Sequence, residues 1–164
     1  MDELKKVSGF VAVILFLGIL GTASGATYNV NSCTEINKSG KWVLTADILN
    51  NGSLYCFNIT VSDVIFDGNG SVIDGVDNAN TYGFYIYNST QTLTNITIVN
   101  VTISDWNYGI FFNNVNRSTV SNTTLNSNAV GIDIQNSDNI TVGDSTVNGS
   151  TQNGIHAQNS RDLI

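Results

Sequence analysis

Residues 109–136 read GIFFNNVNRSTVSNTTLNSNAVGIDIQN, and this stretch contains one complete repeat and the start of the next. Gly131 follows Gly109 at a spacing of 22, and an asparagine stands at the fifth position after each. Gly154 continues the series at a spacing of 23, and Gly83 precedes Gly109 by 26. A period of this length is typical of solenoids, in which each repeat is one coil stacked on its neighbours.

Apolar residues keep the same spacing in two further columns, which are Ile98, Val120, Val142 and Ile164, and Ile103, Leu125 and Val147. The segments around them alternate apolar with polar and are rich in β-branched residues, which predicts short strands. A repeat this short has no room for a crossover helix, so strand leads to strand through turns. Because parallel crossovers are right-handed, we predict an all-β fold, a right-handed single-stranded parallel β-helix.

This fold predicts which side chains form the inner wall of the coil. They are Phe84, Ile86, Ile98, Ile103, Ile110, Phe112, Val120, Leu125, Ile132, Ile134, Val142, Val147 and Ile155. Gly109, Gly131 and Gly154 are expected at turns that need positive φ or a close backbone approach. A column of amides, Asn88, Asn114, Asn136 and Asn159, is expected to hydrogen-bond from coil to coil.

The start of the chain is typical of a secretory signal peptide, which we place at residues 1–26. Lys5 and Lys6 precede an uncharged run over 7–20, and small residues follow at 23–26. The alternative is an uncleaved anchor, because Asp2 and Glu3 weaken the positive start. Either reading places the rest outside the cytoplasm, secreted or at the cell surface, with no membrane span after signal removal.

The remaining chain divides into an atypical segment, 27–62, expected to cap the stack, and the repeats over 63–164. Cys33 and Cys56 are expected to form a disulfide in an oxidising compartment, and two buried free thiols are the alternative. The sequence stops within another repeat, so we expect a truncated C-terminus. An open last coil would favour end-to-end self-association.

Charge excludes two classes of partner. After position 26 the basic residues are only Lys38, Lys41, Arg117 and Arg161, and the acidic residues clearly outnumber them. Nucleic acid and anionic lipid would therefore be repelled.

Several segments together resemble the extracellular parallel β-helix repeat proteins, the superfamily that contains pectin lyases, polysaccharide hydrolases and NosD-like proteins. These segments are residues 41–48, Cys56, residues 64–70, residues 73–75 and the glycine-led coils. The chain looks most like archaeal cell-surface members. The resemblance implies the fold strongly and an activity weakly, because this scaffold carries varied chemistry.

One column of outward residues is a candidate binding site. Tyr85, Phe111, Asp133 and His156 each stand two positions after a repeat glycine and should form a vertical stripe. Aromatic rings beside polar groups can stack on sugars and bond their hydroxyls, and Tyr87, Trp106 and Tyr108 would widen the platform. The alternative is that these rings only cover one another or a loop.

Evidence for catalysis or a cofactor is thin. Polysaccharide-cleaving enzymes need two carboxylates at the scissile bond or a calcium cluster with a base. Asp133 is the one acid of the stripe and a weak catalytic candidate. NosD-like proteins are associated with copper, but one methionine and one histidine do not make a set of soft ligands, so no metal and no cofactor is predicted.

Eleven Asn-x-Ser/Thr sequons permit glycosylation, and we expect Asn51, Asn116 and Asn148 to be used because their neighbours are loop-like. Together these observations predict a non-catalytic cell-surface scaffold that binds a polysaccharide, a surface glycan or other envelope proteins. The alternative is a polysaccharide lyase, glycoside hydrolase or epimerase whose active coils are incomplete here.

Overall fold

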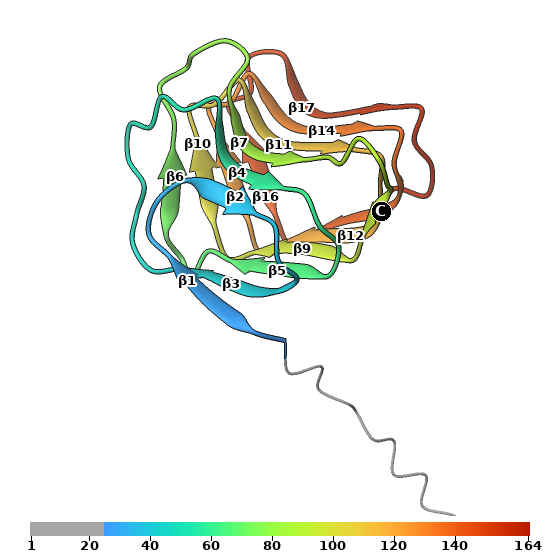
Figure 1. The fold of residues 1–164 in the computed structure, drawn as a ribbon. Helices are drawn as coiled ribbons and strands as arrows, with labels where there is room; N and C mark the ends of the chain where they lie inside the picture. The colour runs from blue at the N-terminus through green and yellow to red at the C-terminus, as the bar shows by residue number, and fades with distance from the viewer. Residues whose placement is uncertain (1–24) are drawn as a thin grey trace, which may run out of the picture.

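The computed structural model describes residues 25–164, and every regular element in this part of the chain is a β-strand. The strands pair in parallel and wind into a right-handed parallel β-helix, which confirms the predicted fold (Figure 1). Their bounds are β1 Thr27–Val30, β2 Thr34–Ile36, β3 Gly40–Leu44, β4 Tyr55–Ile59, β5 Val64–Asp67, β6 Val72–Asp74, β7 Tyr82–Ile86, β8 Leu93–Thr94, β9 Ile96–Val99, β10 Thr102–Ser104, β11 Tyr108–Asn113, β12 Val115–Ser121, β13 Thr124–Asn126, β14 Val130–Gln135, β15 Asp138–Gly143, β16 Thr146–Asn148 and β17 Asn153–Gln158.

Three parallel sheets form the walls of the coil. The first sheet runs β1-β3-β5-β9-β12-β15, with β8 also pairing with β12. The second sheet runs β16-β13-β10-β6, and the third runs β17-β14-β11-β7-β4-β2. Successive strands such as β12, β13 and β14 belong to the first, second and third sheets in turn, so one repeat makes one coil.

Strand register turns the sequence period into vertical stacking. Val120 pairs with Ile98 below it and with Val142 above it in the first sheet. In the second sheet, Leu125 lies between Ile103 and Val147 in the same way. The predicted columns are therefore confirmed, and neighbouring coils are separated by the usual spacing of about 4.8 Å between strands.

The predicted inner wall forms the core. Its members from Phe84 to Ile134 are at most 1% exposed, and Val142 and Val147 are partly buried against them. Ile155 is 50% exposed, because β17 is the last strand of its sheet. At the other end of the core, the rings of Phe57, Phe66 and Phe84 pack with centroids 4.5 to 5.3 Å apart. Aromatic pairs at such distances add to the stabilisation from buried area.

The repeat glycines have a different role from the predicted turn role. Gly109 and Gly131 lie within β11 and β14, and neither has positive φ. A Cβ on Gly109 would lie 2.6 Å from the carbonyl oxygen of Gly131, and a Cβ on Gly131 would lie 2.5 Å from that of Gly154. Glycine is needed here for close approach between coils. Gly154 has no such neighbour, since its nearest contact would be Val147 Cγ1 at 3.7 Å.

Asparagine and aspartate make the corners that were expected of glycine. Asn100, Asn122 and Asp144 have φ of 56°, 45° and 49°, and they stack at one corner. Asn114 and Asn136 take the same left-handed conformation at another corner, with φ of 57° and 49°. Short polar side chains tolerate this conformation better than other non-glycine residues do. These corners explain why the chain is so rich in asparagine.

Amide ladders connect the corners of neighbouring coils. Asn122 Nδ2 donates to Asn100 Oδ1, and Asn100 Nδ2 donates to Asp67 Oδ1 at 3.2 Å. In the predicted amide column, Asn159 Nδ2 donates to Asn136 Oδ1 at 3.4 Å. Asn136 itself donates to Asn113 rather than to Asn114, at 3.0 Å. Asn114 Oδ1 instead accepts from Thr92 at 2.8 Å, and Asn88 Nδ2 donates to the carbonyl of Thr60 at 2.8 Å. Within residues 25–164 the expected ladder is therefore present only at the step from Asn159 to Asn136, and the rest of the prediction was wrong.

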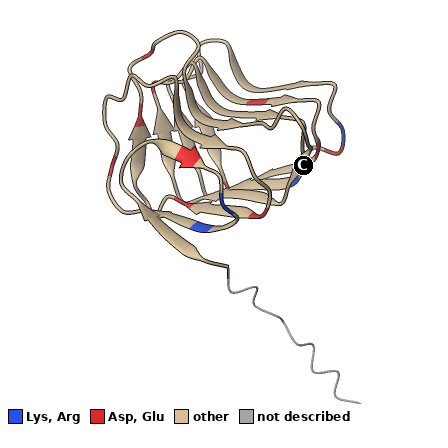
Figure 2. Ribbon diagram, viewed as in Figure 1, with Lys and Arg blue, Asp and Glu red and all other residues tan. Residues whose placement is uncertain are grey.

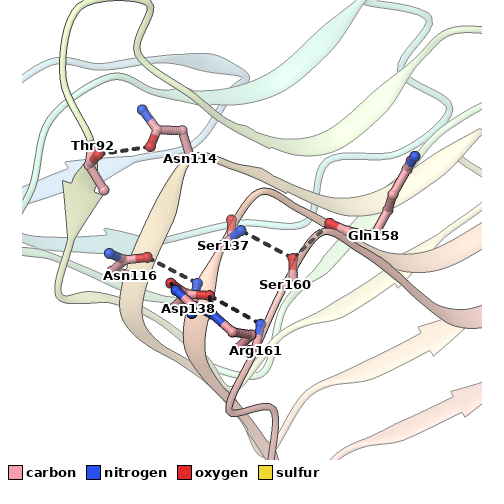
Figure 3. A network of polar contacts seen from close by, with 8 residues as sticks. All are labelled: Thr92, Asn114, Asn116, Ser137, Asp138, Gln158, Ser160 and Arg161. Atoms are coloured by element: carbon pink, nitrogen blue, oxygen red, sulfur yellow. Dashed lines mark hydrogen bonds and ion pairs between the residues drawn. The ribbon is translucent and has the colours of Figure 1, made fainter.

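Serine hydroxyls complete the corners. Ser137 follows the left-handed Asn136, donates to the carbonyl of Gln135 at 2.7 Å and accepts the backbone N–H of Val115, one coil below, at 3.0 Å. Ser160 repeats this arrangement one coil higher, where it accepts the N–H of Ser137 at 3.1 Å (Figure 3). Each hydroxyl thus accepts a hydrogen bond from a backbone N–H group that, because of the bend, is not part of the regular strand-to-strand pairing.

Ser118 and Ser145 repeat the same device at other corners. Ser118 Oγ accepts the N–H of Ile96 at 3.0 Å, and Ser145 Oγ accepts that of Thr123 at 3.2 Å.

An ion pair also connects neighbouring coils, because Asp138 and Arg161 lie 3.1 Å apart at the corner drawn in Figure 3. The Arg161 guanidinium lowers the pKa of the Asp138 carboxyl.

The segment expected to cap the stack supplies β1 to β4, which occupy the ends of the first and third sheets. Cys33 and Cys56 form the predicted disulfide and join the ends of β2 and β4, with their Cα atoms 4.3 Å apart. Trp42 is buried in this segment, and its ring stacks on that of Tyr28 with centroids 4.5 Å apart.

The predicted signal peptide lies almost entirely outside the described residues. Over residues 25–164 there is no helix long and apolar enough to cross a membrane.

One corner of the second sheet gathers three carboxyl groups. Asp105 is left-handed, with φ of 59°, and lies close to Asp74 and Asp77. Burial raises the pKa of the Asp105 carboxyl, and a hydrogen bond with Asp74 and repulsion by Asp77 and Asp74 raise it further. Because the folded state raises this pKa, the ionised Asp105 destabilises the fold at neutral pH.

Replacing Ile132 with aspartate should lower the free energy of unfolding by several kcal/mol, because the side chain is fully buried and no polar partner faces it. Replacing the partly exposed Thr124 with serine is the control and should change stability by less than about 0.5 kcal/mol. Urea unfolding followed by circular dichroism measures both. Equal stability of the two variants would contradict the assigned core.

Replacing both cysteines with serine should lower the free energy of unfolding by about 3 kcal/mol, because the bridge restricts a closed loop in the unfolded chain. The sequence separation of the two cysteines is 23. The same loss should follow when the wild-type protein is unfolded in a reducing buffer. The double serine variant should then show no further effect of reductant.

Replacing Asp105 with asparagine should stabilise the protein at pH 7 by about 0.5 kcal/mol, since it removes a repelled charge and suits the left-handed corner. The stability contribution of a raised carboxyl pKa is present below the unfolded value of about 3.9 and is lost as pH rises through the folded value. The gain should therefore vanish near pH 3. Asp144→Asn, the same change at an exposed corner, is the control in thermal unfolding at both pH values.

Candidate functional site

The predicted stripe exists as one column on the outer side of the third sheet. Tyr85, Phe111, Asp133 and His156 occupy equivalent positions in β7, β11, β14 and β17, and each pairs in register with the next. The rings of Tyr85 and Phe111 are stacked, with centroids 5.3 Å apart and planes 5° apart. The sequence therefore placed these four residues together correctly, while their binding role stays a prediction.

Exposure is uneven along this column. Phe111 is 8% exposed and Asp133 is 3% exposed, because neighbouring side chains cover them. Tyr82 and Tyr108 flank Phe111, with ring centroids 5.5 and 5.9 Å from it. Phe111 thus packs between the tyrosine rings and is largely covered by them. The solvent-accessible part of this surface is formed by the tyrosine rings.

We use the name aromatic face for the outward rings that pack against one another on the third sheet, namely Tyr55, Tyr82, Tyr85, Tyr87, Tyr108 and Phe111. Five of the six tyrosines of the chain are in this group. Of the expected platform residues, Tyr87 and Tyr108 belong to it. Trp106 does not, because it is 1% exposed in the core and its Nε1 donates to the carbonyl of Ile73 at 3.2 Å.

Tyr55 and Tyr82 were missed in the sequence. Tyr82 stacks on Tyr108 at 5.0 Å, and Tyr55 lies 4.5 Å from Tyr85. A signal was present, because Tyr55, Phe57 and Ile59 have the same spacing as Tyr82, Phe84 and Ile86. β4 and β7 pair with these residues in register. The interval between the two sets is longer than the regular repeat, which hid the correspondence.

Two tyrosines of the aromatic face, Tyr82 and Tyr85, are held in the neutral phenol form by their surroundings. Burial raises the pKa of Tyr82, and the adjacent Tyr108, Tyr85 and Tyr55 raise it further. Burial likewise raises the pKa of Tyr85, with contributions from Tyr55 and Tyr87. Neutral hydroxyls can both donate and accept hydrogen bonds, which suits polyhydroxylated ligands.

A shallow depression of about 280 Å³ opens at the lower end of the aromatic face. Its lining is Tyr55, Asn58, Thr60, Tyr85, Tyr87, Asn88 and Ser89. A larger depression of about 670 Å³ lies against the first sheet beside Lys41 and Ile65. It has no aromatic lining, and its Lys41 ammonium is paired with Asp67 at 2.9 Å, where that lysine lowers the pKa of the Asp67 carboxyl.

The polar end of the stripe is a hydrogen-bonded pair. Asp133 Oδ1 lies 2.8 Å from Nδ1 of His156, and Asp133 Oδ2 accepts from Gln135 Nε2 at 3.0 Å. Both oxygens of this carboxylate are therefore occupied by neighbouring side chains. Such an arrangement orients the imidazole and holds the carboxylate in place. Asp133 is also buried, so a substrate could reach this carboxylate only if neighbouring side chains moved.

Charged groups are sparse over the coils, and Figure 2 shows them scattered rather than gathered into one patch.

Of the three predicted glycosylation sites, Asn148 is exposed, whereas Asn51 and Asn116 are partly buried. Asn116 Oδ1 also accepts the N–H of Asp138 at 2.9 Å. Their modification stays a prediction.

The donor groups of the described residues do not suit a metal ion. Over residues 25–164 no group of three or more histidine, cysteine, aspartate or glutamate side chains is arranged to hold a metal ion. Both cysteine sulfurs are in the disulfide, and Nδ1 of the one histidine faces Asp133. Copper requires thiolate, thioether or imidazole ligands in a set, and the described residues do not provide one.

Comparison with known proteins agrees with the fold. No curated protein and no solved structure shows significant similarity to the chain. Residues 47–164 match the family model described as "Periplasmic copper-binding protein (NosD)", which covers β4 to β17 and hence most of the described coils. That description is consistent with an extracytoplasmic location, as is the disulfide, although the described donors do not fit the copper ion it names. By this match and its parallel β-helix, the chain belongs to the NosD family.

Proposed function

We propose that this protein is an extracytoplasmic, non-catalytic β-helix scaffold whose aromatic face binds glycans at the cell surface or in the secreted state. The observation that carries the proposal is the gathering of outward rings on one sheet, with centroids 4.5 to 6.1 Å apart. Aromatic rings with polar edges are well suited to stack on sugar rings and to bond their hydroxyls.

The rigidity of the surface supports this proposal. All of these rings except Tyr87, which directly follows β7, project from β4, β7 and β11, and these strands hydrogen-bond to one another. Side chains fixed on a sheet lose little conformational entropy when a ligand binds. The low positive charge of the chain disfavours nucleic acid as the ligand. Other envelope proteins, and further copies of this chain docked end to end, are additional partners of the same scaffold.

The copper named in the family description is not part of the proposal, because the described residues lack a suitable ligand set. Cleavage of polysaccharide is not proposed either. Both oxygens of Asp133, the one acid of the stripe, are engaged by His156 and Gln135. A scaffold that binds without cleaving is the function that the geometry supports best.

The double variant Tyr85→Ala/Phe111→Ala should lose glycan binding by at least about tenfold, because it removes two stacked rings from the face. The assay is binding of the purified protein to an array of neutral and acidic polysaccharides. Ile65→Ala/Thr97→Ala is the matched control, since these two outward residues pair in adjacent strands of the first sheet. It should bind as the wild type does.

Two results would overturn the proposal. Unchanged binding by the Tyr85→Ala/Phe111→Ala variant would exclude the aromatic face. New reducing ends or unsaturated ends in polysaccharide incubated with the wild-type protein would show catalysis and replace the scaffold by an enzyme.

A further inference from the structure

The depression at the lower end of the aromatic face contains an unusual polar group. Asn58 lies in β4 and pairs in register with Tyr85 of β7. Its Oδ1 atom is buried and has no hydrogen-bond partner within residues 25–164. A buried acceptor without a partner destabilises a fold unless it has a use, and most such groups in proteins are paired. This oxygen therefore needs a donor, and the residue that carries it belongs to the lining of an open depression.

Aromatic rings line the same depression as Asn58. Tyr55 and Tyr85 lie 4.5 Å apart with planes 31° apart, and Tyr87 meets Tyr85 at 6.1 Å with planes 70° apart. The rings thus present both faces and edges around one small space. A pyranose ring has an apolar face for stacking and hydroxyl groups at its rim, which matches this combination.

The remaining wall is fixed by its own hydrogen bonds. Asn88 Nδ2 donates to the carbonyl of Thr60 at 2.8 Å, and Asn88 Oδ1 accepts the N–H of Thr90 at 2.9 Å. Both ends of that amide are occupied, so Asn88 shapes the depression while Asn58 has free bonding capacity. A preformed wall of this kind lowers the entropic cost of binding.

Charge determines the class of sugar. None of the lining residues is charged, and the chain has a formal net charge of −7. A carboxylate or sulfate group placed here would lose its hydration without gaining a cationic partner. A neutral sugar has no such penalty.

We propose that this depression is the subsite for one neutral pyranose residue of the bound glycan, with Tyr55, Tyr85 and Tyr87 around its ring and the Asn58 amide turning to accept a hydrogen bond from a sugar hydroxyl. This inference rests on the proposed function, because it names the class of sugar and the anchoring residue for the same face. In this proposal the sugar is held at Asn58, away from the polar end of the stripe at Asp133 and His156.

The decisive variant is Asn58→Leu, compared with Asn29→Leu on the exposed side of the first sheet. The proteins are made in a host without N-glycosylation, because Asn58 begins a sequon. Titration calorimetry with cellohexaose and mannohexaose should show at least one hexamer bound by the wild type and about tenfold more weakly by Asn58→Leu. Asn29→Leu should match the wild type. Asn58→Leu should melt no lower than the wild type, since it removes an unpaired buried acceptor.

Tyr87→Ala is the second variant, and it keeps the test open if Asn58→Leu folds poorly. It should also weaken hexamer binding, because its ring forms one side of the depression. Hexagalacturonate is the charged probe, and the wild type should bind it more weakly than the neutral hexamer.

The possible failures are distinguishable. If the Tyr85→Ala/Phe111→Ala variant loses binding while Asn58→Leu and Tyr87→Ala bind as the wild type does, the subsite is wrong and the proposed function stands. If the wild type binds no polysaccharide at all, both are wrong. Tighter binding of hexagalacturonate than of either neutral hexamer would overturn the assignment of a neutral sugar.

Discussion

Hydrogen bonding from each coil to the next is the constraint on which the rest of the structure depends. Every strand pairs with the strand directly above or below it, so equivalent residues must superimpose and each corner must return the chain to the same place. The corners achieve this with left-handed asparagine and aspartate, and at several of them a serine follows, as at Asn136 and Ser137. The polar, weakly charged composition is therefore a requirement of the fold, although it looks like that of a disordered chain.

The sequence predicted most of the fold because its period equals the physical repeat. Ile98, Val120 and Val142 stack as their spacing of 22 required. For the glycines, the close approach of the backbone was predicted correctly and the turn position was not. Their spacing alone does not distinguish a turn from a strand position that lies against the next coil. Gly109 is such a strand position. Trp106 was misplaced for a related reason, since alternation of inward and outward side chains fails near corners.

The candidate site was predicted as a column but not as a surface. Register alone placed Tyr85, Phe111, Asp133 and His156 one above another. It did not show that Phe111 and Asp133 are covered, since exposure depends on how neighbouring rings lean. Asn58 could not be found from sequence, because the missing partner of its Oδ1 is a property of the packed structure. The family match shows which family the fold belongs to, while the ligand that this chain can bind depends on its own side chains.

The close fit between coil and period has an evolutionary consequence. Each coil contacts only those beside it, so duplication or deletion of one complete repeat would leave the other corners intact. A gene of this kind can grow or shrink in whole modules, each adding about 4.8 Å of length. A gain or loss of one codon inside a strand would instead shift inward residues outward. Selection should therefore favour length variation by whole coils and confine small insertions to the loops, such as the one between β6 and β7.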